Sequence, residues 1–386
     1  MSAPAAGASS VARTVVYVAN AESHDIAILA LDNDNDNDND NDNDNDNESN
    51  GHNRSNRSNR SGDSDRDARR GALREIDRFA TGGSVMPLAV RPDRRVLYAS
   101  IRSDPYRVLS LAIDPASGRL EEIGSAPLPA SMCWISTDRR GRYLLSASYG
   151  SSLVSVSPID DDDDGVAGAA QQVVATDENA HAIQVDPSNR FALATCLGGG
   201  VVRQMRFDAA TGRLADNVVP AWRARAGAGP RHFVFHRSGP FVYLLNELDA
   251  TIDVLELDRA TGTLRGISVA SALPAQFTGG APWAADLHLT PDGRFLYASE
   301  RRSSTIASFA VDAASGALTK IETVPTETQP RGFAISPDGR CLVAVGQASH
   351  RLSRYAIDGA SGALAKLGDQ PIGRDPNWVE FVELPR

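Results

Sequence analysis

A short turn followed by an apolar strand recurs along most of this 386-residue chain, and only a few folds are built from such repeats. The clear copies are Arg91-Pro-Asp-Arg-Arg-Val-Leu-Tyr-Ala-Ser100, Thr290-Pro-Asp-Gly-Arg-Phe-Leu-Tyr-Ala-Ser299 and Ser336-Pro-Asp-Gly-Arg-Cys-Leu-Val-Ala-Val345. Weaker copies lie at Thr137–Ala147, Asp186–Thr195 and Arg237–Leu245. Proline presets φ and glycine relieves strain, so Pro-Asp-Gly predicts a tight turn before each strand.

A second strand follows the first and ends in an Asp-x-x-Ser/Thr-Gly turn. This element covers residues 306–318 and recurs at 108–120, 202–214, 252–264 and 352–364. The segment Ile26–Asp32 begins in the same way. Each repeat therefore supplies several short strands joined by tight turns.

The spacing of the repeats predicts an all-β fold, a seven-bladed β-propeller. Equivalent strand positions are spaced by 47, 48, 50, 54 and 46 residues, at Tyr98, Leu145, Leu193, Tyr243, Tyr297 and Val343. Tyr17 is a seventh copy, and its longer spacing falls to 42 without residues 32–70. Units of this length are typical of four-stranded propeller blades. We expect one domain over residues 14–386, closed by pairing Trp378–Leu384 with the N-terminal strands; an open β-sandwich array is the alternative.

Two segments do not fit the repeat. Residues 32–70 hold alternating Asp and Asn and three Asn-Arg-Ser triplets, and residues 1–13 are mostly small. Neither can bury enough apolar area to offset the entropy of ordering, so we expect a flexible N-terminus (1–13) and a disordered insert (32–70) in a blade loop. The insert is interpreted as a tolerated expansion, with an interaction tail or an ion-binding tract as the alternative.

Composition excludes several classes of function. The net charge of −10 comes from residues 32–70 and the run Asp160–Asp164, so the remainder is near neutral and no nucleic-acid partner is expected. No long apolar run or signal-peptide core is seen, which predicts no membrane partner. Cys133, Cys196 and Cys341 are scattered, without a CxxC pair, which favours the cytoplasm and argues against a zinc site. Oligomeric state is left open.

The repeat also predicts which residues meet at one end of the central channel. The first strand of each hairpin starts where the second ends, so two positions per repeat share one face. Eight residues before the turn glycine or its equivalent lie Met86, Cys133, His181, Arg231, Ala285 and Arg331. Four residues after the equivalent strand position lie Arg102, Tyr149, Leu197, Glu247, Arg301 and Gln347. Polar residues that differ from repeat to repeat are typical of a site on a scaffold rather than of packing.

These residue types point to an anionic substrate and to acid–base chemistry. Guanidinium groups bind phosphate or carboxylate, and His181 or Glu247 can act as a base towards water. An arginine can stabilise the oxyanion of an opening ester. His232, His236 and His288 have no ligand-like spacing and are interpreted as mostly structural, and no metal site or cofactor is expected.

Several segments resemble the propeller-type 6-phosphogluconolactonase family. They are Gly227-Ala-Gly-Pro-Arg-His-Phe-Val-Phe-His236, Tyr243-Leu-Leu-Asn-Glu-Leu248, Trp283-Ala-Ala-Asp-Leu-His288, Pro325-Thr-Glu-Thr-Gln-Pro-Arg-Gly-Phe333, Val16-Tyr-Val-Ala-Asn-Ala-Glu-Ser23 and Val345-Gly-Gln-Ala-Ser-His350. The resemblance implies hydrolysis of a small anionic sugar lactone, 6-phospho-D-glucono-1,5-lactone, in the oxidative pentose phosphate pathway without a known cofactor. It also implies that the family's His, Glu and two Arg correspond to His181, Glu247, Arg231 and Arg301. Arg102, Arg331 and Gln347 remain as candidate substrate-binding residues.

Two other functions stay open at this point. The same family includes a carboxy-muconate cyclase, which forms a lactone instead of opening one. A non-catalytic binding propeller is the other alternative, although the Trp-Asp dipeptides of the commonest binding propellers are missing. An apolar plug in the channel mouth would favour the binding propeller.

Overall fold

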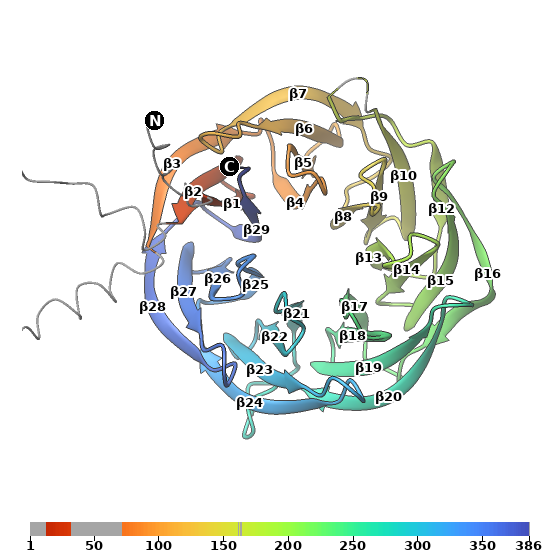
Figure 1. Cartoon of the computed structure of the whole chain (residues 1–386), viewed down its shortest axis with the longest axis vertical. Helices are drawn as coiled ribbons and strands as arrows, with labels where there is room; N and C mark the ends of the chain where they lie inside the picture. Colours follow the sequence, from red (N-terminus) through yellow and green to blue (C-terminus); the bar gives the residue numbers. More distant parts are fainter. Residues whose placement is uncertain (1–12, 32–71, 161, 163, 386) are drawn as a thin grey trace, which may run out of the picture.

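The structure is a computed structural model that describes residues 13–31, 72–160, 162 and 164–385. The expectations of a flexible N-terminus and a disordered insert fall outside these residues, apart from Arg13, and stay predictions. Within the described residues the regular elements are all strands, and they form seven sheets around a central opening (Figure 1). The predicted seven-bladed β-propeller is confirmed.

Blade 1 joins the two ends of the chain. It contains β1 (Thr14–Asn20), β2 (Asp25–Leu31) and β3 (Leu73–Ala80), with the C-terminal β29 (Pro376–Glu383) as its innermost strand. β29 pairs with β1 along its length, Thr14 opposite Glu383 and Ala19 opposite Trp378. This pairing leaves no open edge at the junction and confirms the closure expected from the sequence.

The other six blades are formed by consecutive strands, in order from the channel to the rim. Blade 2 contains β4 (Val85–Val90), β5 (Val96–Ile101), β6 (Arg107–Ile113) and β7 (Leu120–Pro127). Blade 3 contains β8 (Trp134–Thr137), β9 (Tyr143–Ser148), β10 (Leu153–Asp160), β11 (Val166–Ala167) and β12 (Gln172–Ala175). Blade 4 contains β13 (Ala180–Val185), β14 (Phe191–Cys196), β15 (Val201–Asp208) and β16 (Arg213–Arg223).

Blades 5 to 7 follow the same pattern. Blade 5 contains β17 (Pro230–Phe235), β18 (Phe241–Asn246), β19 (Thr251–Asp258) and β20 (Thr263–Ser271). Blade 6 contains β21 (Ala284–Leu289), β22 (Phe295–Glu300), β23 (Thr305–Val311) and β24 (Leu318–Pro325). Blade 7 contains β25 (Pro330–Ile335), β26 (Cys341–Gly346), β27 (Arg351–Ile357) and β28 (Leu364–Pro371).

The seven innermost strands form a closed ring. β29, β4, β8, β13, β17, β21 and β25 each contact the next in this order, and β25 contacts β29 again. The closed ring excludes the open β-sandwich array. The equivalent positions used to count the repeats all lie on the second strand of a blade and are fully buried, at Tyr17, Tyr98, Leu145, Leu193, Tyr243, Tyr297 and Val343.

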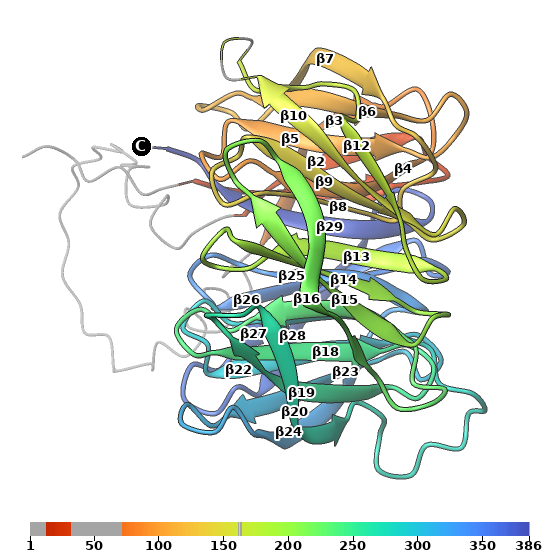
Figure 2. The ribbon, with the colours of Figure 1, turned by 90° about the vertical axis from the view of Figure 1, so that its right-hand side faces the viewer.

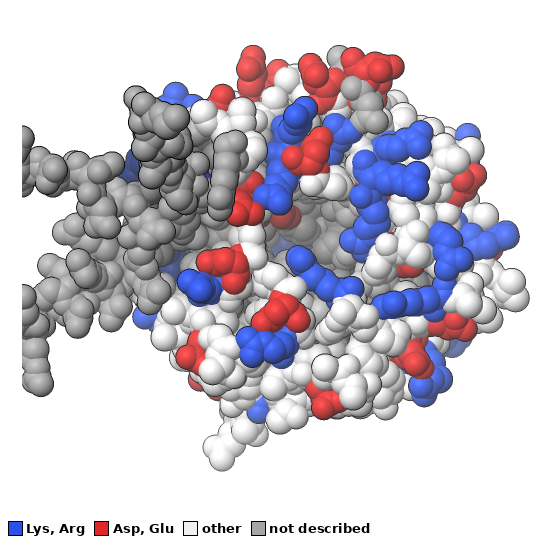
Figure 3. Space-filling view, in the orientation of Figure 1, with Lys and Arg blue, Asp and Glu red and all other residues white. Residues whose placement is uncertain are grey.

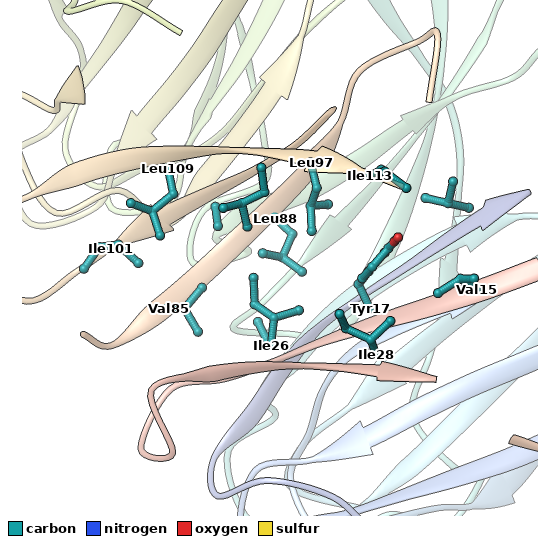
Figure 4. Close-up of a cluster of buried hydrophobic side chains, with 14 of the residues drawn as sticks. Val15, Tyr17, Ile26, Ile28, Val85, Leu88, Leu97, Ile101, Leu109 and Ile113 are labelled. Atoms are coloured by element: carbon teal, nitrogen blue, oxygen red, sulfur yellow. The ribbon is translucent and has the colours of Figure 1, made fainter. Parts of the chain in front are cut away.

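The hydrophobic core lies between neighbouring blades. Figure 4 shows one such layer, in which Tyr17 and Ile28 of blade 1 face Leu88 and Leu97 of blade 2. Alternate residues of a strand point to opposite faces, so each blade contributes one set of apolar side chains to each neighbour.

In four pairs of neighbouring blades, a tyrosine hydroxyl of one blade binds a turn glycine of the next. The hydroxyls of Tyr17, Tyr98, Tyr243 and Tyr297 each donate to the carbonyl of a turn glycine in the next blade, Gly118, Gly165, Gly316 and Gly362. These glycines have φ between 71° and 89°, which an L side chain rarely adopts. In the turn at Asp312, the carboxylate accepts from the backbone N–H of Ala314 and Ser315 and fixes the loop.

Replacing Tyr297 by phenylalanine is expected to lower the free energy of unfolding by about 1–3 kcal/mol, because the buried Gly362 carbonyl loses its donor. Tyr106 is exposed and makes a matched control, so Tyr106→Phe is expected to cost less than about 0.5 kcal/mol. Urea unfolding of both variants measures the difference. Equal stabilities would show that this hydrogen bond does not fasten the blades.

The two faces of the disc differ. The inner strands begin at one face and end at the other, which carries the C-terminus (Figure 2). Figure 3 shows the C-terminal face, where Lys and Arg side chains border the central hollow most densely over β10 and β14. Arginines of the hairpin turns on this face bond to neighbouring backbone, such as Arg139 to the carbonyl of Val185 and Arg190 to that of Arg259. These two arginines therefore join neighbouring blades.

Candidate active site

A β-bulge recurs near the start of the inner strands. The register shifts between Pro230 and His232, between Ala180 and Ala182, and between Pro330 and Gly332, so one extra residue stands in each strand. The extra residues are Arg231, His181 and Arg331. Bulges re-aim a side chain out of the sheet, which here means towards the channel.

The residues that follow the second strands return to the same place. The backbone N–H of Glu247 donates to the Gly229 carbonyl, that of Arg301 to Trp283, and that of Gln347 to Gln329. Each acceptor lies two residues before a residue of the first predicted set, namely Arg231, Ala285 and Arg331. The structure therefore places both predicted sets of residues at the face where the inner strands begin.

Arg231, Glu247 and Arg301 form one ionic cluster between blades 5 and 6. Nε of Arg231 and Nη2 of Arg301 each donate to Oε2 of Glu247 at 2.8 Å. Arg231 also donates through Nη1 to the Ala285 carbonyl, and Arg301 donates to the carbonyls of Trp283 and Ala284. The Arg301 guanidinium carbon lies 3.8 Å from the centroid of the Trp283 ring.

The cluster is buried, which sets its electrostatics. Arg231 is 0% exposed, whereas the side chain of Glu247 is 13% exposed. Burial alone would raise the pKa of Glu247, but Arg231 and Arg301 outweigh burial and hold it below its usual range. Burial and the charge of Arg231 lower the pKa of Arg301. Since both guanidiniums share one carboxylate, the cluster keeps a net positive charge.

Arg331 and Arg102 add positive charge beside the cluster and are partly exposed. Nε of Arg102 donates to the hydroxyl of Ser131 at 3.0 Å. Burial, then Arg231 and Arg102, lower the pKa of Arg331 to about 10. Gln347 is also partly exposed and donates to Asp375 at 2.6 Å. These three residues and Glu247 are partly exposed, whereas His181, Arg231 and Arg301 are buried.

His181 lies at the same mouth and is held neutral. Burial lowers its pKa well below the usual value, and the charges of Arg231, Arg331 and Arg301 lower it further. Nδ1 is buried and has no hydrogen-bond partner within the described part of the chain. A neutral imidazole with a nitrogen lone pair to spare can accept a proton.

Aromatic rings form the floor beneath the polar mouth. The ring of His232 lies 4.6 Å from Trp134, 5.0 Å from His181 and 6.1 Å from Trp378, which belong to three other blades. His232 therefore lies inside the channel. Nδ1 of His232 lies 2.8 Å from Oδ1 of Asp286. The mouth residues His181, Arg231, Glu247 and Arg301 are polar, so these four residues do not form the apolar plug that would favour a binding propeller.

Sequence reasoning missed Asp286 and Asn377. His232 and His288 both contact Asp286, while His236 contacts the Gly293 carbonyl in a turn. Asn377 is the bulge residue of β29, so it occupies the position in blade 1 that is equivalent to His181, Arg231 and Arg331. The residue four after Tyr17 is Ala21, whose N–H donates to Asp375, two residues before Asn377.

Over the described ranges, no cluster of three or more His, Cys, Asp or Glu side chains is arranged to hold a metal ion. In those ranges, too, no helix is long and apolar enough to cross a membrane.

Comparison with known proteins assigns the family. Residues 50–381 match the family described as "Lactonase, 7-bladed beta-propeller". A protein from Pectobacterium carotovorum named 6-phosphogluconolactonase is 43% identical over 266 residues, 69% of this chain and 78% of the relative. One of the same name from Serratia proteamaculans is 40% identical over 312 residues, 81% of this chain and 92% of the relative. The chain belongs to the seven-bladed β-propeller lactonase family.

Solved structures agree with the fold. The Pseudomonas aeruginosa periplasmic gluconolactonase is 26% identical, with a TM-score of 0.80 over 97% of this chain and 100% of that one. A protein from Lactobacillus plantarum, 24% identical, has a TM-score of 0.79 over 97% of this chain and 100% of that one. The second likeness shows the fold alone.

Proposed function

We propose that this chain is a 6-phosphogluconolactonase, which hydrolyses 6-phospho-D-glucono-1,5-lactone to 6-phospho-D-gluconate in the oxidative pentose phosphate pathway. The carrying observation is the gathering of Arg231, Arg301, Arg331 and Arg102 near one carboxylate, Glu247. Such an excess of guanidinium suits a phosphate dianion. The relatives named above bear this activity as their name.

In the proposed mechanism the partly exposed arginines bind the phosphate, and the buried groups act on the lactone ring. Arg331 and Arg102 hold the phosphate, and Gln347 contacts the sugar. His181 accepts a proton from the water that attacks the lactone carbonyl, and it returns this proton to the ring oxygen as the bond between that oxygen and the carbonyl carbon breaks. Arg231 and Arg301 supply positive charge for the developing oxyanion, and Glu247 fixes both guanidiniums. Hydrolysis consumes only water, so the proposed reaction needs no cofactor.

Glu247 is the weaker candidate for the base. Its Oε2 already accepts from two guanidinium groups, and its pKa is held low. A carboxylate in that state has little tendency to take a proton from water. His181 has a buried Nδ1 without a partner in the described residues, which favours it. A bound phosphate would also offset the arginine charges that lower the pKa of His181.

The activity is tested by coupling product formation to 6-phosphogluconate dehydrogenase and NADP⁺. We expect a rate proportional to enzyme concentration and well above the spontaneous opening of the lactone. A parallel reaction with 3-carboxy-cis,cis-muconate separates the cyclase alternative. Lactone formation from the muconate, without hydrolysis of the phosphorylated lactone, would overturn the proposal.

Replacing Arg331 by alanine is expected to raise KM for the phosphorylated lactone about 10-fold to 100-fold with little change in kcat, because a charged hydrogen bond contributes about 1.5–3 kcal/mol. The matched control is unphosphorylated glucono-1,5-lactone, for which KM should hardly change. Steady-state kinetics on both lactones provide the test. Equal losses on both would exclude Arg331 as a phosphate ligand.

For localisation we propose the cytoplasm. Cys133, Cys196 and Cys341 are buried free thiols, as a reducing compartment would maintain them. The proposed substrate is a phosphorylated metabolite, which also fits the cytoplasm.

A further inference from the structure

We propose that Asp286 and His232 are positioning residues that hold the Arg231 guanidinium in place against the Glu247 carboxylate, through a continuous hydrogen-bonded relay. This inference rests on the proposed function, because it assigns a task to the same site. The contacts run from Oδ1 of Asp286 to Nδ1 of His232, and from Nε2 of His232 to Nη1 of Arg231 at 3.1 Å. Arg231 then donates to Glu247.

The chemistry of the contacts fixes the direction of every hydrogen bond. A guanidinium nitrogen can only donate, so Nε2 of His232 must accept from Arg231. The proton of the neutral ring is then on Nδ1, which donates to Asp286 at 2.8 Å. A protonated His232 would direct an N–H at the N–H of Arg231. Burial and the charge of Arg231 accordingly lower the pKa of His232 to about 3, and the neutral tautomer persists at neutral pH.

Asp286 is itself held in place. Its Oδ1 accepts from the backbone N–H of Leu287 at 3.0 Å, and its Oδ2 lies 3.1 Å from Nε2 of His288. The backbone N–H of Asp286 donates to the hydroxyl of Ser299. Asp286 is 7% exposed and His232 is 2% exposed, so little water reaches the relay. An anchored carboxylate can therefore orient the imidazole, and the imidazole can orient Arg231.

The relay explains why two successive residues of β17 serve one site. In a regular strand Arg231 and His232 would point to opposite faces, but the bulge at this position directs both towards the channel. Asp286 reaches them from the neighbouring β21, next to Ala285, whose carbonyl also accepts from Arg231. Blades 5 and 6 are thus joined at the point where Glu247 binds both arginines.

Two substitutions test the roles of Nε2 and Nδ1 of His232 separately. His232→Gln places an amide oxygen near the Nε2 position and keeps an acceptor for Arg231. His232→Asn places an amide nitrogen near the Nδ1 position, keeps the donor to Asp286 and loses that acceptor. We expect His232→Asn to lower kcat about 10-fold to 100-fold, as for a group displaced by about 1 Å, with a small change in KM. His232→Gln keeps the acceptor for Arg231 but loses the donor to Asp286, so its kcat should fall less than that of His232→Asn, at a similar melting temperature.

Nitrogen-15 NMR of histidine-labelled full-length protein, with His232 assigned from the His232→Gln spectrum, tests the relay without an activity assay. We expect wild-type His232 to stay neutral with its proton on Nδ1 from pH 5.5 to 8.5. A proton on Nε2, an imidazolium in this range, or wild-type kcat in a folded His232→Asn variant would each overturn the proposal. An absence of lactonase activity in the wild type would instead overturn the proposed function, while the NMR result still decides the relay.

Discussion

Replacing His181 by alanine is expected to lower kcat for the phosphorylated lactone by about 10²-fold to 10⁴-fold, which is the usual contribution of a positioned base. The reason is that His181 is held neutral by burial and the nearby arginines, and its buried Nδ1 has no hydrogen-bond partner in the described residues. The loss should fall on kcat, with KM changed much less, because His181 acts on water and not on the phosphate. The coupled assay gives both constants once the spontaneous rate is subtracted.

Two variants control this result. His181→Asn keeps a polar side chain of similar size but no usable base, so it should be as impaired as His181→Ala. His24 is an exposed histidine in a turn of blade 1, and His24→Asn should leave kcat and melting temperature unchanged. Wild-type kcat in His181→Ala would remove His181 from the mechanism.

The pH dependence follows from the same assignment. His181 must be neutral to accept a proton, so activity falls as pH drops through its pKa. That pKa lies well below 6.5 in the free protein, because of burial and the neighbouring arginines. For unphosphorylated gluconolactone, whose ionisation does not change here, kcat/KM should therefore stay level between pH 7.5 and 6.5.

Replacing Glu247 by alanine is expected to cost about 3–5 kcal/mol of stability, as well as activity. The carboxylate is the shared partner of Arg231 and Arg301, and its removal leaves two buried guanidiniums facing each other. Glu247→Gln keeps the shape but not the charge, and it should lie between alanine and the wild type. Denaturant unfolding measures the loss.

Glu247→Gln also separates two roles for this residue. A general base would lose activity on conversion to the amide while stability stayed near wild type. The role assigned here requires stability and kcat to fall together, with partial recovery in Glu247→Asp. An inactive Glu247→Gln variant as stable as the wild type would assign the base to Glu247 instead of His181.

The fold could be predicted from the sequence because each repeat contains residues that identify the same strand positions. Each turn glycine and each buried second-strand residue, such as Tyr98 or Tyr297, recurs at a blade-length spacing, and these residues occupy equivalent strand positions. Hairpin geometry alone then places His181, Arg231, Glu247 and Arg301 at one face. The structure adds that Arg231 and Arg301 both donate to Glu247, which spacing cannot give.

The parts that sequence reasoning missed depend on bulges and on chain ends. Period-two alternation assigns His232 to the face opposite Arg231, whereas the bulge brings both into the channel. Asp286 was missed for the same reason, next to the predicted Ala285. Asn377 was missed because β29 ends the chain, so no turn follows from which to count back.

We propose that the mouth formed by the bulged starts of the inner strands holds the lactonase site. A crystal structure of the protein with the product 6-phosphogluconate bound tests it most directly. We expect the phosphate to contact Arg331 and Arg102, and the carboxylate to lie beside His181. Product bound at the face that carries the C-terminus, or distant from these residues, would contradict it.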